Sequence, residues 1–156
     1  MEFPYALIDF EEKEGFTLLV ASIDVPTDGI AKQYGVNRAD FRAIFDVPGI
    51  SANVHCDFTV GNLFKFYTQL IKCYNEVDGV AILEDYSSKR TMLSIDFNGG
   101  TGHVAIDGKF ATLGGMVNMI GFGFETDQTY IKPIVNKLKR FFDELAEIQG
   151  FYDFSI

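Results

Sequence analysis

The chain has 156 residues, 47% hydrophobic and 22% charged, a composition that fits one globular domain over residues 1–156 and excludes disordered, collagen-like and coiled-coil proteins. Twenty-two acidic residues against 13 basic ones give a net charge of −9. This charge repels nucleic-acid phosphates and anionic membrane surfaces, and it attracts basic proteins. We therefore expect a protein partner, and neither nucleic acid nor a membrane.

The two cysteines give no sign of a metal or redox framework. Cys56 and Cys73 form no CxxC pair, so neither a disulfide framework nor a cysteine-based zinc site is expected. The acidic N-terminal segment lacks the basic and apolar regions of a signal peptide, and no apolar run reaches the ~18 residues of a membrane span. These features predict a cytoplasmic protein without metal or cofactor.

The first third of the chain predicts a β-hairpin. Residues 5–10 and 16–25 have the apolar character of strands, and the polar residues 11–15 between them have the composition of a turn. Alternating apolar side chains at residues 41–47 predict another short strand. Residues 30–40 have no clear period, so the sequence leaves the structure of residues 26–48 undefined beyond that strand.

A strand and a helix follow. Residues 51–60 alternate between apolar and polar side chains, which predicts a strand with one buried face. After Gly61 the apolar residues recur at helical spacing as far as Tyr74. This pattern predicts an amphipathic helix with Asn62 as its N-cap.

The rest of the chain predicts four strands and a second helix. The strands are expected at residues 79–86, 91–97, 103–110 and 117–125, and the short loops between them imply an antiparallel meander. The helix at residues 130–147 has Pro133 in its first turn, with Asp127 at the cap. The chain is thus predicted to be α+β, an antiparallel meander of about six to eight strands with two amphipathic helices packed on it.

Two histidines raise the possibility of catalysis. His55 and Asp57 share one face of a predicted strand, and His103 shares a polar face with Asp107. A His–Asp pair is part of a nucleophilic triad, but no G-x-S-x-G sequence supplies the nucleophile. No HExxH-type spacing supports a metal site. We predict no catalytic residues, and the alternative is a small-ligand-binding protein or hydrolase that uses the His55 face.

Two groups of glycines have structural interpretations. Gly99, Gly100 and Gly102 resemble part of a phosphate-binding loop, but they join two predicted strands and fit a hairpin turn. Gly121 and Gly123 alternate within a strand and leave one of its faces without side chains. Close packing of a helix on that face is the prediction, with a shallow groove as the alternative.

Acidic residues cluster at two predicted ends of strands. Because residues 130–142 contain four basic residues and no acidic one, the rest of the chain is more acidic than the average. Acidic groups beside an aromatic residue can form the rim of a protein interface. The predicted partner-binding residues are Glu11, Glu12, Glu14, Glu84, Asp85 and Tyr86. The alternative is that they belong to ordinary solvated loops.

Four stretches occur in order between residues 49 and 142: GISANVHCDFTVGNLFKFYTQLIKCY, GVAILEDY, GTGHVAIDGKF and IGFGFETDQTYIKPIVNKLKRFF. Their most specific parts are GxxxLEDY, GHVxxxG and FETDQTYI. In their order and in their residues the stretches resemble the WapI-type immunity proteins, a bacterial family whose members accompany polymorphic, contact-dependent toxins. The N-terminal third of the chain contributes nothing to this resemblance.

The resemblance implies a non-enzymatic protein that binds and neutralises a cognate toxin domain. The acidic charge agrees with a basic toxin such as a nuclease, because an acidic protein can replace nucleic acid on a basic surface. A secretion-type chaperone or adaptor is the alternative, since small acidic α+β proteins also have that role. The resemblance transfers no site residue, and monomer and homodimer both remain open.

Overall fold

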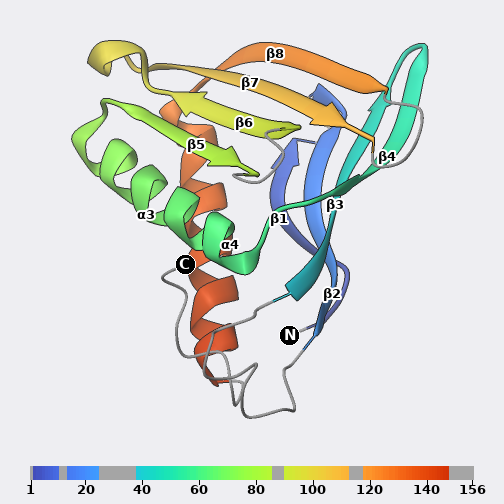
Figure 1. Ribbon diagram of the computed structural model, residues 1–156. Coiled ribbons are helices and arrows are strands. Elements are labelled where there is room, and N and C mark those ends of the chain that lie inside the picture. The colour runs from blue at the N-terminus through green and yellow to red at the C-terminus, as the bar shows by residue number, and fades with distance from the viewer. Residues whose placement is uncertain (1, 11–13, 25–37, 86–89, 113–117, 148–156) are drawn as a thin grey trace.

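The computed structural model describes residues 2–10, 14–24, 38–85, 90–112 and 118–147. In this part of the chain, eight strands form two antiparallel four-stranded sheets, which together with two long helices confirm the predicted α+β class (Figure 1). The strands are β1 (Tyr5–Phe10), β2 (Phe16–Asp24), β3 (Arg38–Val47), β4 (Ile50–Cys56), β5 (Val80–Glu84), β6 (Thr91–Asp96), β7 (His103–Ala111) and β8 (Met119–Asp127). The helices are α3 (Val60–Glu76) and α4 (Ile131–Glu147), with 3-10 turns η1 (Asn98–Gly100) and η2 (Gln128–Tyr130).

The eight strands form two consecutive meanders. The first sheet has the order β1-β2-β3-β4 and the second the order β5-β6-β7-β8, because α3 separates β4 from β5 in the sequence. In Figure 1 the strands of the second sheet run across those of the first, α3 lies alongside β5, and α4 lies beside β1. Of the region that the sequence left undefined, residues 38–47 form β3, whereas residues 26–37 lie outside the described part of the chain.

The first long helix begins earlier than predicted. Thr59, not Asn62, is its N-cap, and the predicted strand ends at Cys56. The Thr59 hydroxyl accepts a hydrogen bond from the Asn62 backbone N–H at 3.1 Å, and the Asn62 side chain accepts one from the Thr59 N–H at 2.9 Å. These reciprocal bonds satisfy two backbone donors at the helix end, which explains why the helix starts three residues before the predicted position.

Phenylalanine side chains fill the space where the two sheets meet. Phe16 and Phe45 of the first sheet contact Phe110 and Phe122 of the second, with ring centroids 4.7 to 5.7 Å apart. Gly108 makes this packing possible, because a Cβ atom there would lie 2.2 Å from the Phe122 ring. The high phenylalanine content of the chain therefore has a structural role, since aromatic rings bury large apolar areas between the sheets.

The second long helix begins as the sequence predicts. Asp127 accepts a hydrogen bond from the Thr129 N–H at 2.8 Å at the start of η2, and Pro133 lies in the first turn of α4. Phe142 of α4 packs against Phe64 and Tyr67 of α3. None of the helices in the described part of the chain has the length and apolar character needed to cross a membrane.

Candidate partner-binding surfaces

The structure separates the members of the predicted acidic clusters. Glu14 and Glu84 are partly exposed, whereas Glu11, Glu12 and Tyr86 lie outside the described residues. Asp85 is only 2% exposed, so its carboxylate cannot form part of an exposed rim as predicted. The alternation of β5 explains the burial, because Asp85 follows Ala81 and Leu83 on the inner side, and its N–H donates to the Thr91 carbonyl.

The carboxylate that contacts His55 is that of Asp40 and not that of Asp57 on its own strand face. His55 Nδ1 lies 2.8 Å from Asp40 Oδ1, and Asp40 also accepts hydrogen bonds from Nε and Nη2 of Arg42 at 2.8 and 2.9 Å. The register of the first sheet places Arg42 of β3 opposite His55 of β4. Hydrogen bonding from Arg42 lowers the pKa of the Asp40 carboxyl below its usual value. These three residues form an ion-paired cluster on the solvent side of the first sheet.

The neighbouring thiol is unsuited to nucleophilic chemistry. Cys56 lies on the buried side of β4, opposite to the side that carries His55. Burial raises the pKa of the Cys56 thiol to about 12, so almost none of it is thiolate at neutral pH. The predicted His–Asp arrangement thus becomes a surface ion-pair cluster whose nearest cysteine faces the core.

The second histidine belongs to the other sheet. His103 is exposed on β7, where its cross-strand partner is Asp127, and Asp107 is exposed on the same strand. His55 and His103 therefore do not share a site. Among the residues that the structure describes, no three His, Cys, Asp or Glu side chains converge in a way that could hold a metal ion.

The solvent side of the second sheet combines acidic and apolar side chains. We call this surface the outer face; it consists of the β5–β8 residues whose side chains point away from the core. Its acidic members are Glu84, Asp96, Asp107, Glu125 and Asp127, and its basic members are His103 and Lys109. Val80, Ile82 and Met119 on the same surface are 45%, 36% and 55% exposed. Sequence reasoning identified the inner sides of these strands and missed the outer face, although the same alternation defines both.

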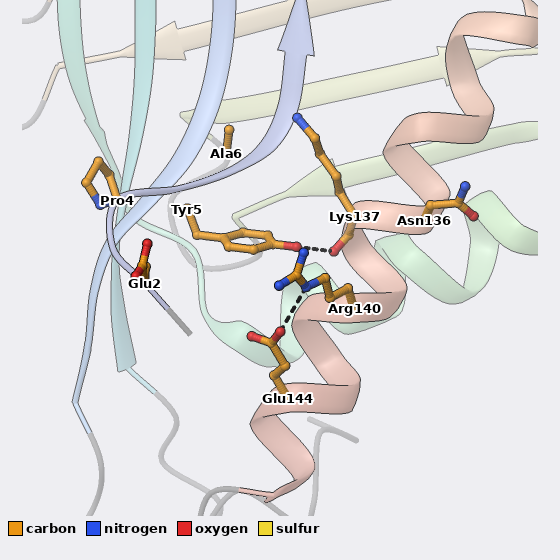
Figure 2. Close-up of a pocket in the computed structure, with 8 residues that line it drawn as sticks. All are labelled: Glu2, Pro4, Tyr5, Ala6, Asn136, Lys137, Arg140 and Glu144. Atoms are coloured by element: carbon orange, nitrogen blue, oxygen red, sulfur yellow. Dashed lines mark hydrogen bonds and ion pairs between the residues drawn. The ribbon is translucent and has the colours of Figure 1, made fainter.

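One cleft lies between residues 2–6 and α4. It has a volume of about 700 Å³, and Tyr5, Lys137, Arg140 and Glu144 are among its lining residues (Figure 2). The Tyr5 hydroxyl donates to the Lys137 carbonyl at 3.0 Å, and Arg140 pairs with Glu144 at 2.9 Å. The polar groups of this cleft thus bond to one another and hold β1 against α4.

The basic segment of α4 is largely neutralised by the helix itself. Lys139 pairs with Asp143 and Arg140 pairs with Glu144, both at the i, i+4 spacing that brings side chains together on one helix face. Lys137 lies 3.6 Å from Asp9 of β1. The acid-free stretch at residues 130–142 therefore does not produce an uncompensated basic surface.

Neither long helix packs on Gly121 and Gly123, so that prediction is wrong; the two glycines are instead among the lining residues of a groove on the side of the inner residues Ile120, Phe122 and Phe124. The groove has a volume of about 150 Å³ and lies between residues 120–124 of β8 and the ends of β2, β3 and β4. Its other lining residues are Glu14, Phe16, Phe45, Val47 and Ile50. The two long helices pack instead on β1 and β5. The volume suits one apolar side chain of a protein partner better than a metabolite, whose sites measure roughly 300–1,000 Å³.

Comparison with known proteins gives one match. A family model described as the immunity protein WapI-like family matches residues 8–146, which is most of the chain. No curated protein and no solved structure matches the chain.

Proposed function

The chain belongs to the immunity protein WapI-like family, and we propose that it acts without catalysis, by binding a cognate toxin domain and covering the surface that the toxin needs. Membership of the family makes the chain a toxin-neutralising immunity protein. The match extends into the N-terminal third, in which the sequence alone gave no resemblance.

The composition of the outer face supports this mode of action. Exposed apolar side chains in one surface patch are typical of protein interfaces, particularly where polar residues surround them. Val80 and Ile82 supply such side chains on β5, with Glu84 and Asp96 beside them, and Met119 supplies another at the opposite edge of the sheet, on β8. A broad patch of this kind binds a protein surface, whereas a small substrate would need a deeper pocket with converging polar groups.

The charge of the outer face favours a basic toxin domain, and a cytoplasmic nuclease is the toxin we propose. Glu84, Asp107 and Glu125 have no ion-pair partner among the described residues. Surfaces that bind nucleic acid carry lysine and arginine to contact phosphates. Unpaired carboxylates can occupy such a surface and accelerate the encounter through long-range attraction.

The direct test measures binding and inhibition together. The purified chain is mixed with the toxin domain encoded beside its gene, and both the dissociation constant and the cleavage of RNA and DNA are measured. We expect a folded complex, loss of cleavage, and association that slows as salt increases. A toxin that remains active in the presence of excess chain would contradict the proposal, and binding only to the unfolded toxin would indicate a chaperone.

A matched pair of charge-reversal variants tests which surface accelerates association with the toxin domain. Glu84→Lys with Asp107→Lys changes the outer face, whereas Asp46→Lys with Asp57→Lys changes exposed residues of the first sheet and the loop after it by the same net charge. At low salt the first variant should associate on the order of tenfold more slowly than the second. Equal association rates would show that the outer face does not guide the encounter.

A further inference from the structure

The alternation of hydrogen-bonded and non-bonded pairs between β7 and β8 determines which backbone N–H and C=O groups of β8 point away from β7. Where the hairpin begins, the Thr112 N–H donates to the Asn118 carbonyl at 2.8 Å, so these two residues form a hydrogen-bonded pair. Such pairs alternate with non-bonded pairs along an antiparallel ladder, and the β7–β8 register continues without a shift. The next bonded pairs therefore involve Ile120, Phe122 and Phe124.

The alternate residues of β8 consequently turn their backbone N–H and C=O groups away from β7. These residues are Met119, Gly121, Gly123 and Glu125. Within the described part of the chain, no hydrogen bond satisfies their outward backbone groups. As far as the described residues go, β8, nine residues long, is therefore an open sheet edge.

The inner side chains beside this edge are less buried than the rest of the core. Ile120, Phe122 and Phe124 are partly exposed, whereas the matching inner residues of β6 and β7 are buried. The groove of about 150 Å³ lies directly against them, and Phe16 and Phe45 form part of its opposite wall. An apolar side chain that entered the groove would complete the phenylalanine packing between the two sheets.

We propose that β8 accepts an extended segment of the toxin domain as a ninth strand, with one apolar side chain of that segment inserted in the groove. The proposal rests on the proposed toxin-binding function. Strand addition satisfies the outward backbone groups of β8, while pockets for alternate side chains provide specificity. The space beside Gly121 is open, because the nearest atom to an added Cβ, the Gly108 carbonyl oxygen, is 4.0 Å away.

Charge identifies the kind of segment that fits. Glu14 lines the groove, and Glu125 lies on the exposed side of β8. These carboxylates favour a segment in which apolar and basic side chains alternate, since alternate residues of a strand point to opposite faces. A second copy of this chain at the same edge would bring two acidic outer faces together, which like-charge repulsion opposes.

The test compares two substitutions at one position. Gly121→Pro removes the outward N–H without removing a bond to β7, whereas Gly121→Ala adds a side-chain carbon and keeps the N–H. For the toxin domain encoded beside the gene, we expect Gly121→Pro to weaken binding about tenfold or more and Gly121→Ala to change it less than about threefold. Circular dichroism and thermal unfolding would verify that both variants are folded.

A second pair tests the groove without changing the backbone of β8. Ile50 is 51% exposed at the groove, so Ile50→Lys is expected to fold and to weaken binding about tenfold, while Ile50→Leu binds normally. Undiminished binding by both Gly121→Pro and Ile50→Lys would overturn strand addition and leave toxin neutralisation intact. Failure of the unmodified chain to bind would instead refute the proposed function. A dimer of the chain that Gly121→Pro abolishes would assign the edge to a second copy and overturn the proposal.

Discussion

The two sheets complete their surfaces in different ways. On the solvent side of the first sheet, Asp40, Arg42 and His55 pair with one another, so the charges are compensated within the sheet. On the outer face of the second sheet, Glu84 and Asp107 have no ion pair among the described residues. The charge of Asp40 is therefore compensated within the first sheet, whereas Glu84 and Asp107 of the second sheet present charge that a partner can neutralise.

The same contrast separates the two edges of the second sheet. On β5 the outward N–H of Ile82 donates to Gln69 Oε1 of α3 at 3.0 Å, and α3 covers this edge (Figure 1). On β8 the corresponding backbone groups have no partner within the described residues. Folded proteins normally protect their sheet edges against association. An open edge beside an apolar groove thus makes β8 a suitable place for the addition of a partner strand.

The largest expected effect on the free energy of unfolding comes from truncating a buried side chain of α3, the helix that covers the β5 edge. Leu70 of α3 is fully buried, and Leu70→Ala should lower the free energy of unfolding by about 2–5 kcal/mol. Ile120→Ala on β8 should cost much less, about 1 kcal/mol, because this side chain is already partly exposed. Urea unfolding measures both values. Equal losses would mean that β8 contributes to the core as fully as the covered edge does.

A smaller effect is expected from the hydrogen bond that protects β5. Gln69→Ala removes the acceptor for the Ile82 N–H and should lower the free energy of unfolding by about 0.5–1.5 kcal/mol. Lys72→Ala on an exposed position of the same helix serves as the control. Faster hydrogen exchange at the Ile82 amide in the first variant alone would confirm that Gln69 covers the edge. Unchanged exchange would remove this difference between β5 and β8.

The smallest effect concerns the paired charges of the first sheet. The pKa of the Asp40 carboxyl is lowered in the folded protein from its ordinary value of 3.8, mainly by hydrogen bonding from Arg42. Its contribution to stability is therefore present above that ordinary value and is lost as the pH falls through the lowered pKa. Asp40→Asn should therefore slightly reduce the loss of stability that the protein shows as the pH falls below 4. If the melting temperature of Asp40→Asn falls below pH 4 as steeply as that of the unmodified chain, this role of Asp40 is contradicted.

The sequence predicted most elements because each carries a local periodic pattern. The helical spacing of residues 130–147 locates α4 closely, and the alternation of residues 51–60 locates β4 but continues four residues past its end at Cys56. The error at the start of α3 arose because the alternating pattern continues through Thr59, which therefore was predicted to lie in the strand; Thr59 is in fact the N-cap, and Asn62 forms the capping box with it. Local chemistry thus placed the elements and left boundaries uncertain by a few residues.

The surfaces were harder to predict because they depend on pairing between distant segments. The Asp40–His55 contact requires the register of β3 on β4, and β3 lies in a region without a clear period. The position of β8 at a sheet edge follows from the order of the meander, in which β8 is the last strand, and not from a pattern within its own residues. The alternating Gly121 and Gly123 were the one signal of the groove, and the sequence favoured packing of a helix as their explanation.

Amide hydrogen exchange of the free chain and of its complex with the toxin domain, resolved by residue, tests the central claim most directly. We expect the outward amides of Gly121, Gly123 and Glu125 to exchange rapidly in the free protein and slowly in the complex, because the added strand supplies their acceptors. The Ile82 amide, already bonded to Gln69, should change little. Protection that appears on β3 and β4 while the β8 amides continue to exchange rapidly would contradict the account.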